Sequence, residues 1–441
     1  MMFPRVLVVS LVRVNAADAI NNGLLLRSVF GDWPKENLAQ IYSEGANGDE
    51  GFFGSYYKLG PDDRWFGKTF YRLKARAPAA GLVPGPTAAI GEGHPGRGSW
   101  IHRTIGRLVV DSGFYELVFR PRISRKMLAW ISEFQPDVIL AQGYTLSFSW
   151  LPVMLHRRTG TPLAFFTTDD WPTYVYRDFP MTWLLHRSAR SLITHAGLRI
   201  AFGDKMRRAF ENKYGAPFVS LYHLDAKERF PEYAGRSSRA VRSIAFVGSL
   251  YLKRHEALID LLSVIRKGSD IEHSVAIHVY APEIPEEVPE TLRKAPEIVF
   301  YPLPSHDDLP AVLAREDILF MAESFSVDPD AISLSLSTKC HLFMASGTPI
   351  LAYGPPYSGT IDYAAREGWA AVVTERNAEG LEQALRRLQR DCGYRNELVA
   401  RAMDVFLRNH ELRSGQRIFR NWIASAAHAV NDGGRAAQQE S

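Results

Sequence analysis

Short runs of aliphatic and β-branched residues alternate with helical stretches along most of this chain, and this alternation constrains the fold more than any other feature. In the first half, the predicted strands are 6–12, 138–141 and 163–166, and the predicted helices are 24–30 and 123–134. This rhythm is typical of a parallel sheet covered by helices. We therefore predict an α/β fold.

The second half repeats the rhythm after a polar, basic stretch that contains Pro231 and Gly235. Its predicted strands are 244–247, 275–280, 298–301, 318–321 and 350–353. Its predicted helices are 257–265, 309–314 and 338–345. A chain of 441 residues is also longer than one core usually supports. We expect two Rossmann-like domains, 1–230 and 243–410, joined by a linker at 231–242.

Two segments give no regular pattern. Residues 44–99 are rich in Gly, Pro and aromatic side chains, which predicts an irregular excursion or insertion. Residues 429–441 are polar, and we expect a disordered tail there.

The net charge of +4 is too small for a nucleic-acid-binding protein that depends on many phosphate contacts. This sum hides an asymmetry between the two halves. Residues 1–240 carry 31 basic and 21 acidic side chains, a net charge of +10, whereas residues 241–441 carry 21 and 27, a net charge of −6. The first half is therefore suited to an anionic partner such as phospholipid headgroups.

The cysteine content and the hydropathy pattern indicate a cytoplasmic protein. Cys340 and Cys392 are the two cysteines of the sequence, too few for a disulfide scaffold. The apolar run near the N-terminus is not followed by a small-residue cleavage site, and residues 138–155 are too polar to span a bilayer. We expect a cytoplasmic location, which also allows peripheral contact with the inner face of the plasma membrane.

The segment Ser337-Thr338-Lys339, followed eight residues later by Gly347, has the residue types of an anion site. A hydroxyl residue at a helix start leaves backbone N–H groups free, and a lysine adds a full positive charge, so the segment can hold a diphosphate. The alternative is that Ser337 or Thr338 caps the helix and Gly347 ends it.

These residues, with Ala345-Ser346-Gly347-Thr348-Pro349, resemble the donor-binding segment of GT-B glycosyltransferases, particularly family 4. Phe246-Val247-Gly248-Ser249 and the pair Lys253-Arg254 are similar to that family's glycine loop and basic pair. The resemblance covers residues 243–375. It implies a two-domain GT-B fold with a nucleotide sugar between the domains, and a helix at 411–428 that returns to the N-terminal domain.

The resemblance also implies transfer of a sugar from a nucleotide-diphosphate donor to a hydroxyl of a glycan, glycolipid or small-molecule acceptor, with retention of configuration. It implies that no metal or other cofactor is needed, because Lys253, Arg254 and Lys339 take the place of a divalent ion. Cations there would stabilise the departing diphosphate, although Lys253-Arg254 is also consistent with a solvated pair. The predicted donor-binding residues are Gly248, Ser249, Lys253, Arg254, Glu323, Ser337, Thr338 and Lys339.

The chain departs from the family pattern at a pair of glutamates eight residues apart. Leu334 and Leu342 stand at these positions. Glu323, Asp328 or Asp330 could contact the sugar or ribose hydroxyls instead, but each is equally consistent with a solvated loop carboxylate.

Two loops of the first half are candidates for the acceptor side. Asn21-Asn22-Gly23 is expected in the loop after the first strand, where Asn22 and Gly23 would let acceptor and diphosphate approach; a simple tight turn is the alternative. Asp169 precedes Trp171-Pro172 in a segment that resembles a family His-Asp motif, with Thr168 in place of the His. Asp169 is the candidate catalytic, acceptor-orienting carboxylate, unless it caps the following turn.

Residues 64–76 predict a basic amphipathic helix. Trp65, Phe66, Phe70 and Leu73 share one face, and Lys68, Arg72 and Arg76 recur on another. Such a helix can bind an anionic membrane near a lipid acceptor, whereas packing of the aromatic residues in the core is the competing interpretation.

Two other functions stay open. The missing glutamates and histidine allow a non-catalytic GT-B protein that binds a nucleotide or glycan or partners another transferase, and a nucleotide-sugar epimerase has the same architecture. The scattered histidines, including His255, His306 and His341, show no metal-ligand spacing.

Overall fold

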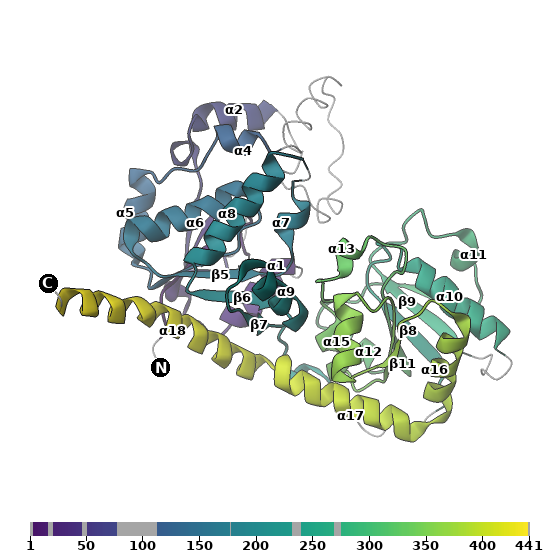
Figure 1. Ribbon diagram of the computed structural model, residues 1–441. Helices are drawn as coiled ribbons and strands as arrows, with labels where there is room; N and C mark the ends of the chain where they lie inside the picture. Colours follow the sequence, from purple (N-terminus) through teal and green to yellow (C-terminus); the bar gives the residue numbers. More distant parts are fainter. Residues whose placement is uncertain are drawn as a thin grey trace. The chain divides into compact units, whose positions relative to one another are not determined.

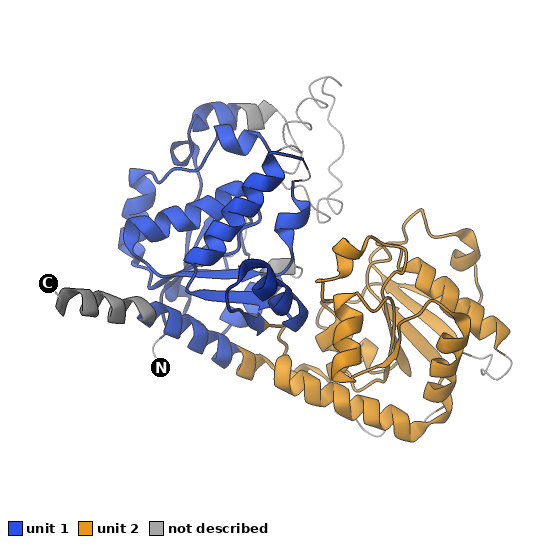
Figure 2. Cartoon of the chain, in the orientation of Figure 1, with its two compact units in different colours: residues 1–220, 416–441 blue, residues 221–415 orange. Residues whose placement is uncertain are grey.

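The chain folds into two compact units, shown in different colours in Figure 2. Unit 1 comprises residues 1–220 and 416–441, and unit 2 comprises residues 221–415. Residues 221–230 therefore belong to unit 2. The computed structural model describes residues 3–15, 21–45, 51–76, 113–176, 178–231, 240–268 and 275–439, and the side chains of residues 21–22, 73–76 and 429–439 lie outside this description.

Unit 1 contains a seven-stranded sheet in the order β3-β2-β1-β4-β5-β6-β7, and the neighbouring strands from β3 to β6 pair in parallel. All four residues of β1 are buried, as expected for a central strand of a parallel sheet. The strands are β1 Val6–Val9, β2 Leu38–Tyr42, β3 Ser55–Lys58, β4 Val138–Ala141, β5 Leu163–Thr167, β6 Leu198–Phe202 and β7 Val219–Leu221.

Helices pack against this sheet, and α6 and α8 lie side by side over it (Figure 1). Ser124 and Thr145 cap α5 and α6 through hydrogen bonds from the N–H groups of Met127 and Phe148. The helices are α1 Asn21–Phe30, α2 Gly67–Arg76, α4 Tyr115–Val118, α5 Arg125–Phe134, α6 Leu146–Thr159, α7 Trp171–Tyr174, α8 Met181–His195, α9 Asp204–Tyr214 and α18 Leu412–Gln439, with 3-10 turns η1 Lys35–Asn37 and η2 Pro61–Asp63.

Unit 2 contains a six-stranded sheet in the order β10-β9-β8-β11-β12-β13, in which every neighbouring pair is parallel. This is the strand order of a Rossmann fold. The elements are β8 Ser243–Val247, α10 His255–Lys267, β9 Ala276–Ala281, α11 Glu290–Arg293, β10 Ile298–Pro302, α12 Leu309–Leu313, β11 Ile318–Ala322, α13 Pro329–Ile332, α14 Cys340–Ala345, β12 Ile350–Tyr353, α15 Gly359–Glu367, β13 Ala371–Val373, α16 Ala378–Arg390 and α17 Cys392–Asn409, after the 3-10 turn η4 Lys227–Arg229.

The expected α/β fold is confirmed for both halves, but four local predictions are wrong. The first strand ends at Val9 rather than at residue 12, and part of the irregular segment 44–99 forms edge strand β3 and helix α2. Asn21-Asn22-Gly23 forms the first turn of α1 rather than a loop or tight turn. The helix expected at 338–345 begins at Cys340. Residues 77–99 lie outside the described part.

The amphipathic helix expected at 64–76 begins at Gly67, and its aromatic residues do not share one environment. Phe70 is 6% exposed and packs against Phe119, with ring centroids 5.1 Å apart, so it belongs to the core. Trp65 and Phe66 precede the helix and are exposed. Leu73 and Arg76 lie outside the described side chains. Of the three aromatic residues predicted to share a face, only Phe70 is therefore in the core.

Helix α18 contributes to the core of unit 1 from the far end of the sequence. Phe419 and Ile423 are fully buried, and the Phe419 ring lies 5.2 Å from that of Phe30. The Gln416 amide donates to the Ser28 carbonyl at 2.7 Å, and Arg420 forms an ion pair with Asp32 at 3.1 Å. The predicted disordered tail at 429–441 lies outside the described side chains, although the helical backbone extends to Gln439.

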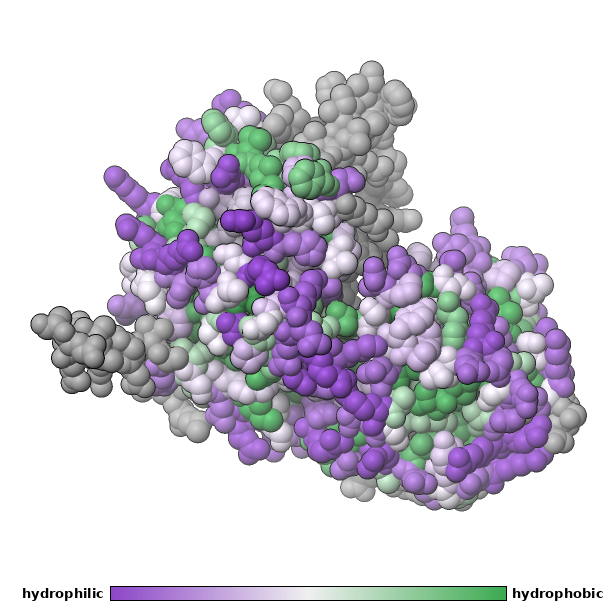
Figure 3. Space-filling view, viewed as in Figure 1, coloured by the Kyte–Doolittle hydropathy of each residue, from purple (hydrophilic) through white to green (hydrophobic). Residues whose placement is uncertain are grey.

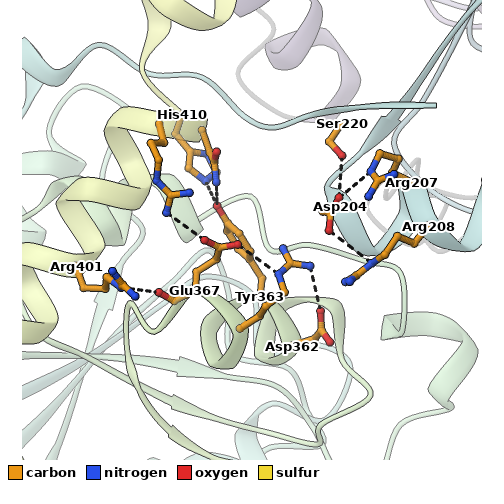
Figure 4. Close-up of polar contacts among 12 residues, drawn as sticks. Asp204, Arg207, Arg208, Ser220, Asp362, Tyr363, Glu367, Arg401 and His410 are labelled. Carbon is orange, nitrogen blue, oxygen red and sulfur yellow. Dashed lines mark hydrogen bonds and ion pairs between the residues drawn. The ribbon is translucent and has the colours of Figure 1, made fainter. Parts of the chain in front are cut away.

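Unit 2 contains a cluster of buried histidines where its first residues meet the end of α17. His223, His341 and His410 are 7%, 3% and 1% exposed. The His410 Nδ1 lies 2.8 Å from the His223 carbonyl, and its Nε2 lies 3.0 Å from the Tyr363 hydroxyl, the contact drawn in Figure 4. Because a carbonyl only accepts, Nδ1 carries a proton, and burial lowers the pKa of His410 to about 4, so that Nε2 is unprotonated and accepts from Tyr363. His410 is therefore held as a neutral ring.

No helix in the described part of the chain combines the length and apolar character needed to cross a membrane.

Candidate functional site

The strand order of unit 2 places a ligand-binding position between β8 and β11. The chain leaves β8 toward β9 on one side of the sheet and later enters β11 on the other, so the loops after these two strands diverge. In open parallel sheets, ligands bind outside the carboxyl ends of the strands at such a switch point. Gly248 directly follows β8 and Glu323 directly follows β11, so these two predicted donor-binding residues lie at the switch point.

Arg254 and Glu323 link these two loops. The Arg254 Nε and Nη2 donate to Glu323 Oε2 at 3.2 and 3.1 Å. The Glu323 side chain is only 5% exposed and that of Arg254 19%. Among the described residues, no hydrogen bond to Glu323 Oε1 is seen. Glu323 therefore positions the guanidinium and still has one oxygen that can accept a hydroxyl.

Lys339 brings a second cation to the same place. Its ammonium lies so close to Gly248 that a Cβ on this glycine would be 2.5 Å from Nζ, and Gly248 also has a left-handed φ of 124°. Burial, together with the nearby Arg254, lowers the pKa of Lys339 to about 8, while Glu323 opposes this shift. Within the described part of the chain, the ammonium forms no ion pair. Arg254 is paired with Glu323, so an anion is the partner that the Lys339 ammonium lacks.

The remaining predicted donor residues surround this pair less closely. The Ser249 hydroxyl accepts from the Tyr251 N–H, and Thr338 is exposed. The Ser337 N–H donates to the Thr360 hydroxyl at 2.9 Å, and the residue that precedes α14 is Lys339. The prediction that Ser337 or Thr338 opens this helix is therefore wrong, because the helix begins at Cys340, while their predicted contact with a diphosphate stays a prediction.

Lys253 lies in a different setting from Arg254. Its side chain is exposed, and Leu252 and Lys253 both adopt left-handed backbone angles, with φ of 58° and 55°. Such consecutive left-handed residues are costly and produce the sharp turn into α10. The contact of Lys253 with a diphosphate stays a prediction.

The alternative carboxylates differ in their surroundings. Asp328 and Asp330 are exposed, and Asp328 caps α13 through the Asp330 N–H at 3.0 Å. Leu342, at one position of the missing glutamate pair, is buried, and Leu334 is half-buried. Among the three carboxylates proposed from the sequence, Glu323 is the one that lies beside Arg254.

Unit 1 has a second polar site, around Asp169 at the end of β5. Asp169 accepts hydrogen bonds from the Tyr174 hydroxyl at 3.0 Å and the Tyr144 hydroxyl at 3.3 Å, and Tyr144 also contacts Thr168 at 2.6 Å. Burial raises the pKa of Asp169 to about 6, although both tyrosines lower it. Asp170, not Asp169, precedes α7 and contacts the Thr173 hydroxyl, so the alternative in which Asp169 caps this turn is wrong.

Tyr144 and Tyr174 were not among the predicted site residues. Tyr144 follows β4, next to the switch point of the unit 1 sheet between β1 and β4, and has a left-handed φ of 78°. A Cβ on the preceding Gly143 would collide with the Trp171 ring. The Gly-Tyr pair directly after a predicted strand was the available signal. Gly23 lies in α1, and the Asn22 side chain lies outside the described residues.

Among the described residues, no group of histidine, cysteine and carboxylate side chains has the arrangement of a metal site. His255 and His341 are buried, and His306 contacts Arg229 at 2.8 Å.

Comparison with known proteins gives a family match for the first unit. Residues 75–221 match the model of the glycosyl transferase 4-like domain. No curated protein matches the chain significantly.

Solved structures match over nearly the whole chain, at low identity. Sucrose-phosphate synthase from Thermosynechococcus elongatus has a TM-score of 0.61 at 12% identity, over 95% of this chain and 99% of that one. The trehalose 6-phosphate synthase of Burkholderia multivorans has a TM-score of 0.59 at 12% identity, over 99% of both chains. Anabaena HepE in complex with UDP and glucose has a TM-score of 0.57 at 12% identity, over 96% and 100%. Together, these comparisons show that the chain has the GT-B fold and that residues 75–221 are similar to the glycosyl transferase 4-like domain.

Proposed function

We propose that this protein transfers a sugar from a nucleoside-diphosphate sugar to an acceptor hydroxyl, with retention of configuration. The observation that carries the proposal is the pair of cations, Arg254 and Lys339, at the switch point of unit 2. The departing diphosphate gains negative charge as the glycosidic bond breaks, so fixed cations lower the barrier. UDP is the first nucleotide to test, because the similar HepE structure is a complex with UDP and glucose.

The two cations supply charge that a divalent ion provides in other transferases, so we expect turnover without added metal. Gly248 admits the Lys339 ammonium, and Glu323 holds the Arg254 guanidinium in place. Lys253 and Ser249, in the loop after β8, and Ser337 and Thr338 remain candidate donor contacts. Turnover in the presence of EDTA tests the metal-independent part of the proposal.

We assign the acceptor to the Asp169 site of unit 1. An ionised carboxylate held by two tyrosine hydroxyls can accept a hydrogen bond from the acceptor hydroxyl and orient it. Donor and acceptor must then come within reach of each other, which domain closure provides in two-domain enzymes. The acceptor is a glycan, a lipid-linked sugar or a small molecule, and sugar-phosphate acceptors belong in the panel because sucrose-phosphate and trehalose-phosphate synthases share the fold.

Calorimetric titration with UDP tests the donor site. Lys339→Met removes the ammonium at nearly constant volume, and we expect UDP affinity to fall at least tenfold. Lys267→Met is the matched control, because Lys267 is an exposed lysine at the C-terminal end of α10, and this variant should bind UDP normally. Equal UDP affinity for both variants would show that the cation pair is not the diphosphate site.

The Asp169→Asn variant separates the acceptor role from the donor role. It should bind UDP like the unchanged protein but lose transfer, because the amide cannot replace an ionised carboxylate as an acceptor of hydrogen bonds on both oxygens. Nuclear magnetic resonance of the glycosidic product reports whether the anomeric configuration is retained.

A second candidate is a GT-B protein that binds a nucleotide sugar without turning it over. The buried Leu342, at a position where the family pattern has a glutamate, favours this reading. Tight UDP binding with neither hydrolysis nor transfer across an acceptor panel would support it. Product formed without any acceptor would instead indicate an epimerase.

A further inference from the structure

An apolar patch is exposed on unit 1 where the segment before α2 meets α4. Four large side chains form it, and they are 56%, 68%, 47% and 52% exposed: Trp65, Phe66, Phe114 and Val118. Figure 3 shows hydrophobic side chains gathered over the end of unit 1 at which Figure 1 places these two helices. Single exposed apolar residues are normal on a protein surface, but a contiguous group marks an interaction site.

Backbone hydrogen bonds join the two segments into one surface. The Trp65 N–H donates to the Arg120 carbonyl at 2.9 Å, and Arg64 forms a β-bridge with Pro121. Phe114 and Val118 are four residues apart on one helical turn, so they share a face. Below the surface, Phe70 packs against Phe119 and anchors α2 to α4. These contacts hold the two segments of the patch together.

Phe66 is exposed and has a strained backbone conformation at the start of α2. Its φ is 51°, in the left-handed region that large side chains avoid at a cost of ~1–2 kcal/mol. The side chain recovers little burial within the chain in return, because it is 68% exposed. Strained residues that point outward occur at sites of interaction.

Among the described residues of the two segments that form the patch, the exposed charges are almost all positive. Within residues 61–72 and 113–122, the exposed cations are Lys68, Arg72, Arg120 and Arg122, and the exposed carboxylate is that of Asp62. The Arg122 guanidinium lies 5.8 Å from the centre of the Trp65 ring. Asp63 and Glu116 are buried and do not offset the surface charge. A rim of one sign selects a partner that presents many negative charges.

We propose that this patch docks unit 1 on the surface of an anionic lipid bilayer. Tryptophan and phenylalanine insert at the depth of the headgroups, and lysine and arginine contact the anionic phosphates around them. A protein partner with a mixed-charge surface fits a rim of four exposed cations and one exposed carboxylate less well. The proposal shares no residue with the donor or Asp169 sites and does not depend on the proposed transfer.

Vesicle co-sedimentation of the full-length protein tests this docking. We expect binding to vesicles of phosphatidylglycerol and phosphatidylcholine, release by 0.5 M NaCl, and at least tenfold weaker binding to phosphatidylcholine alone. Phe66→Ser and Trp65→Ser should each reduce the binding constant about tenfold, since each removes the burial of one aromatic side chain. Arg122→Gln should reduce it severalfold and weaken the salt dependence.

Leu303→Ser provides the matched control, because Leu303 is a 41% exposed apolar residue of unit 2. It should leave vesicle binding unchanged. Circular dichroism and urea unfolding of unit 1 show that each variant remains folded. The proposal is overturned if the unchanged protein binds neither vesicle, if it binds both equally, or if the folded Phe66→Ser and Trp65→Ser variants bind as well as the Leu303→Ser control.

Discussion

Lowering the pH from 7.5 to 5.0 should destabilise unit 2 through its buried histidines. Burial lowers the pKa of His223 to about 3 and that of His410 to about 4, with the neighbouring His410 adding to the shift of His223. In the unfolded chain, both return to about 6.5. Between these values the unfolded state binds protons that the folded state excludes, so stability falls as the pH falls below 6.5.

The size of this effect follows from the pKa in the unfolded state. For each histidine, the free energy of unfolding falls by ~1.4 kcal/mol for every pH unit below the unfolded pKa. At pH 5, which is about 1.5 units below that pKa, the loss is about 2 kcal/mol per histidine. His223 and His410 together therefore lower the free energy of unfolding of unit 2 by about 4 kcal/mol at pH 5. Because pH 5 lies above both folded values, the result does not depend on how far each pKa is lowered. Burial also lowers the pKa of His341, which contributes in the same direction.

Fluorine resonances of 5-fluorotryptophan can follow this unfolding in unit 2 alone. Trp369 is the one tryptophan of residues 221–415, and it is fully buried beside Tyr363. Its resonance, assigned with a Trp369→Phe variant, reports the free energy of unfolding in urea at each pH. Unit 1 tryptophans give separate signals, so two transitions can be resolved.

A His410→Gln variant isolates one histidine. The variant should be less stable at pH 7.5, yet it should lose about 2 kcal/mol less than the unchanged protein on going to pH 5.0, since one proton-binding group is gone. His428→Gln, an exposed histidine on α18, should leave the pH dependence unchanged. If His410→Gln and the unchanged protein lose the same free energy, the neutral buried state of His410 is refuted.

Three further predictions concern the donor site and the core. UDP affinity should fall as the pH rises through about 8, because the Lys339 ammonium deprotonates there, and Lys339→Arg should retain affinity to higher pH in the same titration. Gly248→Ala should weaken UDP binding at least tenfold by calorimetry, since its Cβ would be 2.5 Å from Lys339 Nζ, and normal binding would contradict the packing described. Phe419→Ala should destabilise unit 1, but not unit 2, by ~3–5 kcal/mol in urea, because the ring is fully buried.

The sequence predicted those strands whose hydrophobic runs are continuous. Residues 138–141 and 163–166 were recognised because each run is local and both faces of the strand are buried. Strand β2 was missed because Gln40 interrupts it. That side chain is fully buried and bonds to the Ser10 hydroxyl and the Val12 carbonyl, which no local pattern reveals. Strand β3 was missed because Ser55–Lys58 is short and lies at the edge of the sheet.

The sequence predicted which residues belong to the candidate site, but not which of their side chains contact each other. The strand, glycine and basic-pair order located Gly248 and Arg254, yet Arg254 and Glu323 are 69 residues apart and meet only because β8 and β11 are neighbours. The contact of Tyr144 with Asp169 depends likewise on β4 and β5 lying side by side, whereas Tyr174 is only five residues from Asp169. Spacing along a chain does not encode such contacts, so they came from the tertiary structure.

The position of α18 in the core of unit 1 has a consequence for biosynthesis. Phe419 and Ile423 emerge from the ribosome after all of residues 221–415, so Phe30 and Trp33 lack their α18 partners while unit 2 is translated. At 5–20 residues per second this interval lasts roughly 10–40 s. Unit 2 can fold co-translationally from a contiguous segment, whereas the earlier-made unit 1 reaches its native core only after unit 2 has been synthesised.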